Sequence, residues 1–192
     1  MKSILLAVQG VRIKAVNSRK GYQLLDSFSD KASDVYDVIH DILKFHESSA
    51  YRAEDSQQVV EVKRLHRDKR QIEGLLDAGY FGSTSEIRNL DKWDTVAYKK
   101  RIRDVDLSPF YFLFDLPEGR ELGFLLLQST GIEGVQTLLA KMLHEQFVRD
   151  FPDDRLRFHR IIPEDVRKQL AKAPLSERLG SSATVCRQIL RL

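Results

Sequence analysis

Basic side chains recur at every second position in two segments of this chain. The first set is Lys99, Arg101 and Arg103, and the second is Arg155, Arg157 and His159. Alternate residues of a β-strand share one face of a sheet, so each set would present its cations together. Ammonium and guanidinium groups neutralise phosphates, and exposed aromatic rings stack on unpaired bases. The aromatic residues nearby in the sequence are Tyr80, Phe81, Trp93 and Tyr98.

These two segments have two interpretations. If both strands lie in one sheet with their basic faces aligned, the six side chains form a continuous nucleic-acid-binding stripe. The alternative is a pair of ordinary solvated faces, whose charges meet acidic neighbours such as Asp104 and Asp106. We expect the stripe to bind DNA or RNA.

A second candidate site lies on the strand expected from residue 57 onward, where Glu61 and Lys63 share a strand face and Asp55 precedes them. This short segment partly resembles the PD-(D/E)xK nuclease pattern. The resemblance implies carboxylates that hold Mg²⁺ and a lysine that orients the attacking water. The proline of the pattern is absent, and Asp55 is close in the sequence to the other two residues. A solvated strand face is the alternative.

Other motifs for chemistry are incomplete. Residues 127 to 134 join a strand to a helix through Gly131, which is the geometry of a phosphate site, but they lack the lysine of a Walker loop. Thr130 and Glu133 instead match a capping box.

The histidines show no HExxH spacing, and His46 falls on an apolar helix face, as a core histidine would. We therefore predict no metal site and no cofactor, with Mg²⁺ required only by the nuclease alternative.

The clearest structural segment is residues 109 to 134. Phe110 to Leu116 and Leu122 to Leu127 are apolar on both faces, which predicts two strands covered on each side. Pro117 to Arg120 has the composition of a hairpin turn. Other strands are expected at residues 3 to 16 (as a hairpin or one strand with a glycine bulge), 57 to 67, 71 to 76, 95 to 103 and 155 to 162. Residues 17 to 30 and 47 to 56 are expected to be connections.

Two amphipathic helices are predicted from apolar residues at helical spacing. The first covers residues 35 to 46, with Asp30 or Ser33 as its N-cap, and the second covers residues 131 to 149. A short helix is expected from Pro163 to residue 172. Hairpin-length links outnumber crossover helices, so the predicted fold class is α+β, with a mixed, largely antiparallel sheet and two main amphipathic helices.

Composition sets wider limits. The 192 residues are 42% hydrophobic and carry a formal net charge of +3. We expect one α+β domain over residues 1 to 192, in which 174 to 192 are loosely attached or belong to a truncated segment. No apolar run approaches the roughly 20 residues of a membrane span. The single cysteine, Cys186, excludes an internal disulfide and is compatible with the cytoplasm.

These observations favour a soluble, cytoplasmic binding protein over an enzyme. The predicted partner is nucleic acid, reached through the basic strand faces or as a subunit of a nucleic-acid-associated complex. A metal-dependent nuclease is one alternative. A structural subunit that binds a protein partner, or forms a homo-oligomer, is the other.

Overall fold

The structure is a computed structural model, and it describes residues 4–16, 21–29, 32–130 and 135–161. The chain divides into two compact units, Met1–His159 and Arg160–Leu192. Only residues 160 and 161 of the second unit are described, so the predicted helix at 163 to 172 and the segment 174 to 192 lie outside the described residues.

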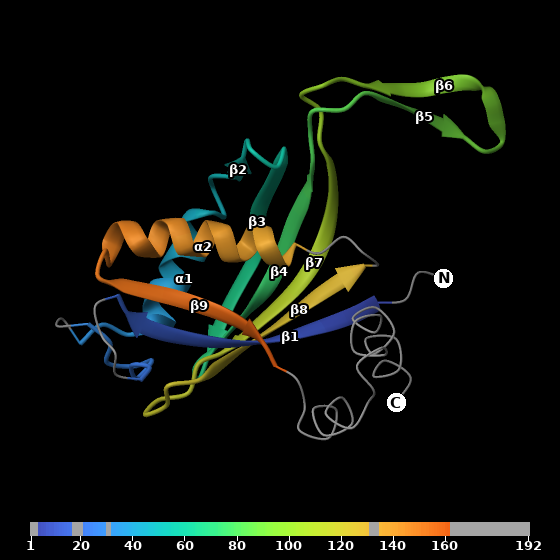
Figure 1. Ribbon diagram of the computed structural model, residues 1–192. Coiled ribbons are helices and arrows are strands. Elements are labelled where there is room, and N and C mark those ends of the chain that lie inside the picture. The colour runs from blue at the N-terminus through green and yellow to red at the C-terminus, as the bar shows by residue number, and fades with distance from the viewer. Residues whose placement is uncertain (1–3, 17–20, 30–31, 131–134, 162–192) are drawn as a thin grey trace, which may run out of the picture. The chain divides into compact units, whose positions relative to one another are not determined.

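Nine strands and two helices form within the described residues (Figure 1). Their bounds, in chain order, are β1 Ile4–Ala15, α1 Val35–Phe45, β2 Tyr51–Ala53, β3 Gln58–Asp68, β4 Gln71–Tyr80, β5 Ser85–Asn89, β6 Lys92–Lys100, β7 Asp106–Asp115, β8 Gly123–Thr130, α2 Gln136–Asp150 and β9 Asp154–Arg160.

The main sheet of the first unit has the strand order β2-β3-β4-β7-β8-β1-β9, and β5 and β6 form a separate two-stranded sheet. The pairings β2–β3, β3–β4, β4–β7, β7–β8 and β8–β1 are all antiparallel. Short hairpin links join β2 to β3, β3 to β4 and β7 to β8. The main sheet curls into a half-barrel, and both helices pack against its inner face (Figure 1). The predicted α+β class with a largely antiparallel sheet is therefore confirmed in outline.

The hairpin predicted from residue 109 is present as β7 and β8, which are neighbours at the centre of the main sheet. Phe110, Phe112 and Phe114 are buried, whereas the residues between them are only half-buried. The prediction of full cover on both faces is wrong, because the helices cover only one face of this sheet. Gly119 adopts a φ of 63° in the turn, where glycine avoids the strain of a β-carbon.

Within the segment predicted from residue 3 to 16, Ile4–Ala15 forms one strand, β1, and its pairing with β8 shows no bulge at the glycine. Its register with β8 runs without a shift from Ile4 to Val11, through Gly10. A β-carbon added at Gly10 would lie 2.4 Å from the imidazole of His159. Glycine at this position therefore leaves room for the His159 side chain to lie over β1.

Helix α1 begins one residue after Asp34, whose side chain accepts a hydrogen bond from the backbone N–H of Tyr36. The predicted caps are therefore wrong, Ser33 by one residue and Asp30 by four, while the helix itself is confirmed. Helix α2 has the expected buried side chains, including Leu139, Met142 and Phe147. Its predicted start at residues 131 to 134 lies outside the described residues.

The described residues include no helix that is both long enough and apolar enough to cross a membrane.

Candidate nucleic-acid interface

The segment from Thr84 to Asp104 contains β5, β6 and the turn after them, and we call it the arm. Strands β5 and β6 pair with each other and form a two-stranded sheet separate from the main sheet (Figure 1). Every residue of β5 is exposed, and so are all but two residues of β6. The arm therefore has no hydrophobic core of its own.

Side-chain hydrogen bonds stabilise the turn between β5 and β6 at the tip of the arm. The Asn89 side chain accepts a hydrogen bond from the Asp91 backbone N–H at 2.8 Å, as in an Asx-turn. The guanidinium of Arg88 donates to the Trp93 carbonyl at 3.0 Å and to the Glu86 carboxylate at 2.6 Å. These contacts keep Trp93 at the exposed end of the arm.

The first predicted basic set lies at the base of the arm, but it does not form one continuous strand face. Strand β6 ends at Lys100, so only Lys99 belongs to it, whereas Arg101 and Arg103 lie in the following turn. Asp104 accounts for the end of β6 at Lys100. Its carboxylate accepts a hydrogen bond from the Arg101 backbone N–H at 2.7 Å and another from the Tyr98 hydroxyl. The hydrogen bond to Asp104 raises the pKa of Tyr98, and the same bond lowers the pKa of Asp104.

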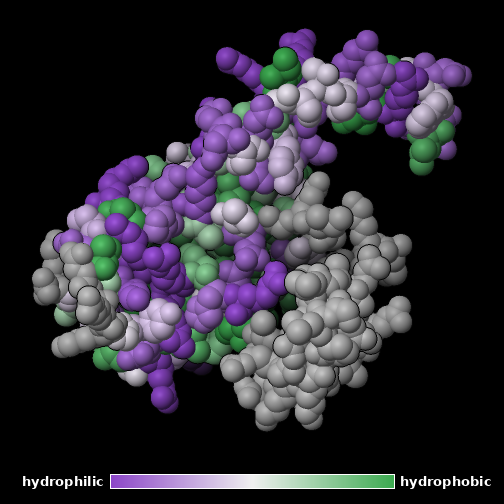
Figure 2. Space-filling model, in the orientation of Figure 1, coloured by the Kyte–Doolittle hydropathy of each residue, from purple (hydrophilic) through white to green (hydrophobic). Residues whose placement is uncertain are grey.

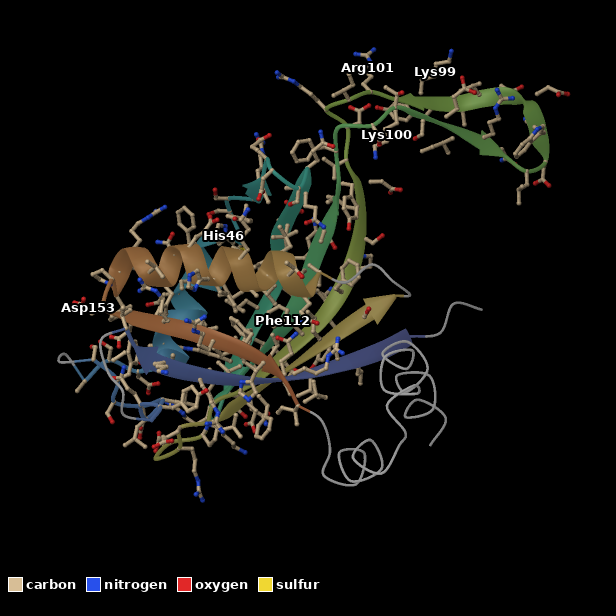
Figure 3. All side chains as sticks on the ribbon, in the orientation of Figure 1. His46, Lys99, Lys100, Arg101, Phe112 and Asp153 are labelled. Atoms are coloured by element: carbon tan, nitrogen blue, oxygen red, sulfur yellow. The ribbon has the colours of Figure 1, made fainter. Side chains whose placement is uncertain are left out.

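Lys99 and Arg101 nevertheless project from the same side of the arm, while Lys100 points to the other side (Figure 3). Lys100 donates to the Tyr80 carbonyl at 3.2 Å. Lys99 lies 3.5 Å from Glu86, which already binds Arg88. No described carboxylate forms an ion pair with the side chain of Arg101 or Arg103, so the base of the arm carries excess positive charge.

Large apolar side chains are exposed along the same arm. Their exposed fractions are 53% for Ile87, 86% for Leu90, 61% for Trp93, 50% for Tyr98 and 62% for Ile102. Figure 2 shows hydrophobic residues among hydrophilic ones on the surface of this hairpin. At the base, Thr84 to Glu86 and Val96 to Asp104 line a shallow, open groove. Cations, exposed rings and a groove thus occur together on one two-stranded element.

The second predicted basic set lies on β9, an edge strand of the main sheet. Its side chains alternate as expected, with Leu156 buried and Arg157 exposed. The guanidinium of Arg155 donates hydrogen bonds to the backbone carbonyls of Pro152 and Asp154 at 2.7 and 2.8 Å, so it is already engaged within the protein. Loss of solvation, assisted by the nearby charge of Arg12, lowers the pKa of His159, which disfavours its cationic form.

The two basic sets therefore do not lie in one sheet, since β6 belongs to the arm and β9 to the main sheet. The condition for a single aligned stripe is not met. The arm keeps Lys99, Arg101 and Arg103 close together. On β9, Arg157 is exposed, and no hydrogen bond joins its side chain to a described residue.

The structure brings together two of the three residues of the nuclease alternative and gives the third, Asp55, a different partner. Lys63 lies 3.3 Å from Glu61 and 3.6 Å from Asp77 of the neighbouring strand β4. Asp55 instead receives two hydrogen bonds from Lys141 of α2, each at 2.7 Å, and these lower the pKa of its carboxyl group. Hydrogen bonding to Glu61 raises the pKa of Lys63, as expected for a lysine held as a counterion.

Asp77 is the residue of this cluster that sequence reasoning missed. It faces Glu61 in the β3–β4 register, and Lys63 lies at a register shift between Val62 and Arg64. The sequence carries no local signal for that shift. Among the described residues, no three histidine, cysteine, aspartate or glutamate side chains are grouped closely enough to hold a metal ion.

His46 has the structural role expected of a core histidine. Its side chain is buried, and its Nδ1 atom lies 2.6 Å from the Ser49 carbonyl. It follows the last residue of α1 and also contacts the ring of Tyr51.

Comparison of the chain with protein-family models, curated proteins and solved structures finds no match.

Proposed function

We propose that this protein is a non-catalytic nucleic-acid-binding protein and that its β5–β6 arm makes the contact. The observation that supports this proposal is the joint placement of Lys99, Arg101 and Arg103 with the exposed ring of Trp93 on one hairpin. Cations on such an element neutralise phosphates, and an exposed indole stacks on a base.

The shape of the arm agrees with this role. A two-stranded ribbon is narrow enough to enter the major groove of B-form DNA, and β-ribbon proteins use this geometry. Nearly all residues of β5 and β6 are exposed, so binding to nucleic acid would disrupt few contacts within the arm. Arg157 on β9 would be a separate, weaker contact with the backbone of the nucleic acid.

The test is a fluorescence anisotropy titration with labelled single- and double-stranded DNA and RNA of mixed sequence, over about 50 to 200 mM salt. In the double variant Arg101→Ala, Arg103→Ala, affinity should fall for every sequence. The slope of log affinity against log salt should flatten by roughly one to two units, because up to two phosphate contacts are lost.

A matched control removes two exposed basic residues of the main sheet, Lys14 and Arg52, by alanine substitution. This control should keep the wild-type slope. Arg157→Ala tests β9 separately and should change the slope by less than the arm variant does.

Trp93 is the only tryptophan in the chain, so intrinsic fluorescence reports directly on the arm. Stacking on bases should quench its emission during the titration. Absence of binding to every probe at about 50 mM salt would overturn the proposal. An equal loss of affinity in the Lys14→Ala, Arg52→Ala control would also overturn it.

A further inference from the structure

Strand β9 ends the main sheet and lies beside β1, and two contacts align the two strands (Figure 1). The Val16 backbone N–H donates a hydrogen bond to the Asp153 carbonyl at 2.8 Å. At the other end of the pair, Gly10 lies against the imidazole of His159. Residue numbers fall along β1 as they rise along β9, so the strands are antiparallel, and facing residues can be counted inward from both contacts.

Basic residues face each other at two successive positions of this strand pair. Counting by two places Lys14 opposite Arg155 and Arg12 opposite Arg157, and all four lie on the outer face of the sheet. Like charges directly opposite each other destabilise a strand pair. Asp153 precedes Arg155 in the same row, yet no described carboxylate forms an ion pair with any of the four cations. The described residues therefore leave this positive charge without a partner.

Arg12 is partly buried and also lacks a hydrogen bond at one of its nitrogens. Its guanidinium carbon lies 4.4 Å from the centre of the Tyr22 ring, and its Nε atom is buried without a hydrogen-bond partner in the part of the chain that the structure describes. Water screens a partly buried charge less than an exposed one. A carboxylate placed beside Arg12 would therefore be stabilised more than one beside a fully hydrated cation.

Strand β9 also has a free backbone edge. In an antiparallel strand, the N–H and C=O groups of successive residues point alternately to one neighbour and to the other side. Asp153 bonds to β1, so the backbone groups of Leu156 and Phe158 point away from β1, where the main sheet has no further described strand. Unpaired backbone groups of this kind are a template for one more strand.

Charge and alternation identify the occupant of this edge. Two copies of β9 would repel each other through Arg155 and Arg157, so a second copy does not fit. Nucleic acid supplies negative charge, but it has no peptide backbone to complete the ladder. An extended peptide with acidic residues at alternate positions supplies both. Its other residues would lie beside Leu156, which is buried, and Phe158, which is half-buried, so apolar side chains suit those positions.

We infer that β9 is a docking edge for an extended acidic segment of a partner protein, which adds to the main sheet as a further strand. The segment alternates acidic residues, which lie beside the cations of the outer face, with apolar residues on the core side. Backbone hydrogen bonds to β9 supply affinity, and the acidic side chains supply specificity. The inference is separate from nucleic-acid binding by the arm.

The first experiment is a fluorescence anisotropy titration without nucleic acid. The probe is a labelled peptide of about nine residues that alternates glutamate with valine, which is long enough to cover the seven residues of β9. We expect saturable binding below about 1 mM. A peptide of the same composition, with its glutamates grouped at one end, is the control. It should bind at least about tenfold more weakly, because it cannot place its carboxylates on one face of a strand.

Methylation of backbone nitrogens tests whether the peptide forms a strand. One peptide carries N-methyl groups on all its valines, and another carries them on all its glutamates. Only one set of N–H groups can point to β9, so one peptide should lose binding and the other should keep it. Loss with methylated valines would indicate an antiparallel added strand, and loss with methylated glutamates a parallel one.

Charge reversal tests the residues of the outer face. Arg12→Glu with Arg157→Glu should weaken binding of the glutamate–valine peptide by at least about tenfold and create binding of a lysine–valine peptide. Such a gain cannot come from a misfolded protein. The matched control is Arg52→Glu with Arg64→Glu, two exposed arginines near the opposite end of the main sheet, and it should bind as the wild type does.

Four results would overturn the inference. They are no binding of the glutamate–valine peptide below about 1 mM, equal binding of the grouped peptide, equal binding of the two methylated peptides, and undiminished binding by the charge-reversed protein. Equal binding of the methylated peptides would mean that this face attracts anions, nucleic acid included, without pairing with a strand. None of these results involves Lys99, Arg101 or Arg103, so the proposal for the arm stands or fails separately.

Discussion

Arg70 and Asp34, which are far apart in the sequence, form a bidentate ion pair. Two guanidinium nitrogens of Arg70 donate to the two carboxylate oxygens of Asp34, at 2.5 and 2.9 Å. The same guanidinium donates to the Leu116 carbonyl at 2.7 Å and lies over the ring of Tyr36. Asp34 is the N-cap of α1, so this pair joins the start of the helix to the β3–β4 turn and the end of β7.

Arg70→Ala should lower the free energy of unfolding by about 2 kcal/mol, because it leaves a partly buried, capping carboxylate without its charged donors. Arg70→Lys should recover little of this loss, since an ammonium group cannot make the bidentate contact with the Asp34 carboxylate. Chemical denaturation measures both variants.

Asp34→Asn separates the two roles of Asp34. Asparagine keeps the side-chain oxygen of a good N-cap but removes the charge that Arg70 binds. Asp34→Asn should therefore be more stable than Asp34→Ala, and the difference estimates the cap. Equal stability of the two variants would show that the cap contributes nothing.

Leu139→Ala should lower the free energy of unfolding by about 2 to 5 kcal/mol, since the Leu139 side chain is fully buried and its truncation leaves a cavity. Leu90→Ala is the control, because Leu90 is 86% exposed at the tip of the arm. The control should change stability by less than about 0.5 kcal/mol. A similarly small change for Leu139→Ala would contradict its place in the core.

Gly74→Ala should cost at least about 2 kcal/mol of stability, because a new β-carbon overpacks the sheet. That carbon would lie 2.0 Å from the backbone carbonyl oxygen of Arg64, which cannot move without breaking the β3–β4 pairing. Gly10→Ala should cost less, since the conflicting atoms are the end of the exposed His159 side chain. Gly21→Ala meets nothing within 4 Å and serves as the control. A Gly10→Ala protein less stable than Gly74→Ala would contradict this order.

The elements that the sequence predicts well are those whose signals are local. The β7–β8 hairpin follows from two apolar runs and a turn that contains Pro117 and Gly119, all within one segment. Helix α1 follows from the spacing of its own buried residues, and β9 from the alternation of Leu156 with its charged neighbours.

The candidate site depends on pairings between distant residues, which periodicity does not reveal. The alternation from residue 95 to 103 predicts a strand, but it does not show that β6 pairs with β5 apart from the main sheet. The end of β6 at Lys100 depends on the hydrogen bonds that Asp104 accepts. The approach of Asp77 to Lys63 likewise requires the register of β3 with β4.

The nuclease alternative has its own test, which is incubation of the purified protein with plasmid DNA or RNA and Mg²⁺ or Mn²⁺. We expect intact substrate, because Asp55 binds Lys141 and Lys63 serves as a counterion to Glu61 and Asp77. Cleavage that disappears in both Glu61→Ala and Asp77→Ala proteins, but persists in Asp55→Ala, would establish a metal site on β3 and β4.

The last prediction concerns alkaline pH and the hydrogen bond from the Tyr111 hydroxyl to the Glu73 carboxylate, which is 2.6 Å long. This bond, with a smaller contribution from burial, raises the pKa of Tyr111 to about 12. Because the folded-state pKa lies above the unfolded value of about 10, the stabilisation is complete below pH 10 and is lost as the pH rises through 12.

Tyr111→Phe should therefore lower the free energy of unfolding by about 1 kcal/mol at neutral pH, where the hydrogen bond is intact. The difference between wild type and variant should shrink above about pH 10 and reach zero before pH 12. Denaturation at several pH values measures this convergence, and ultraviolet titration of the phenolate should show one late-ionising tyrosine fewer in the variant. A stability difference that stays constant between pH 7 and 12 would mean that Glu73 does not hold the hydroxyl proton of Tyr111.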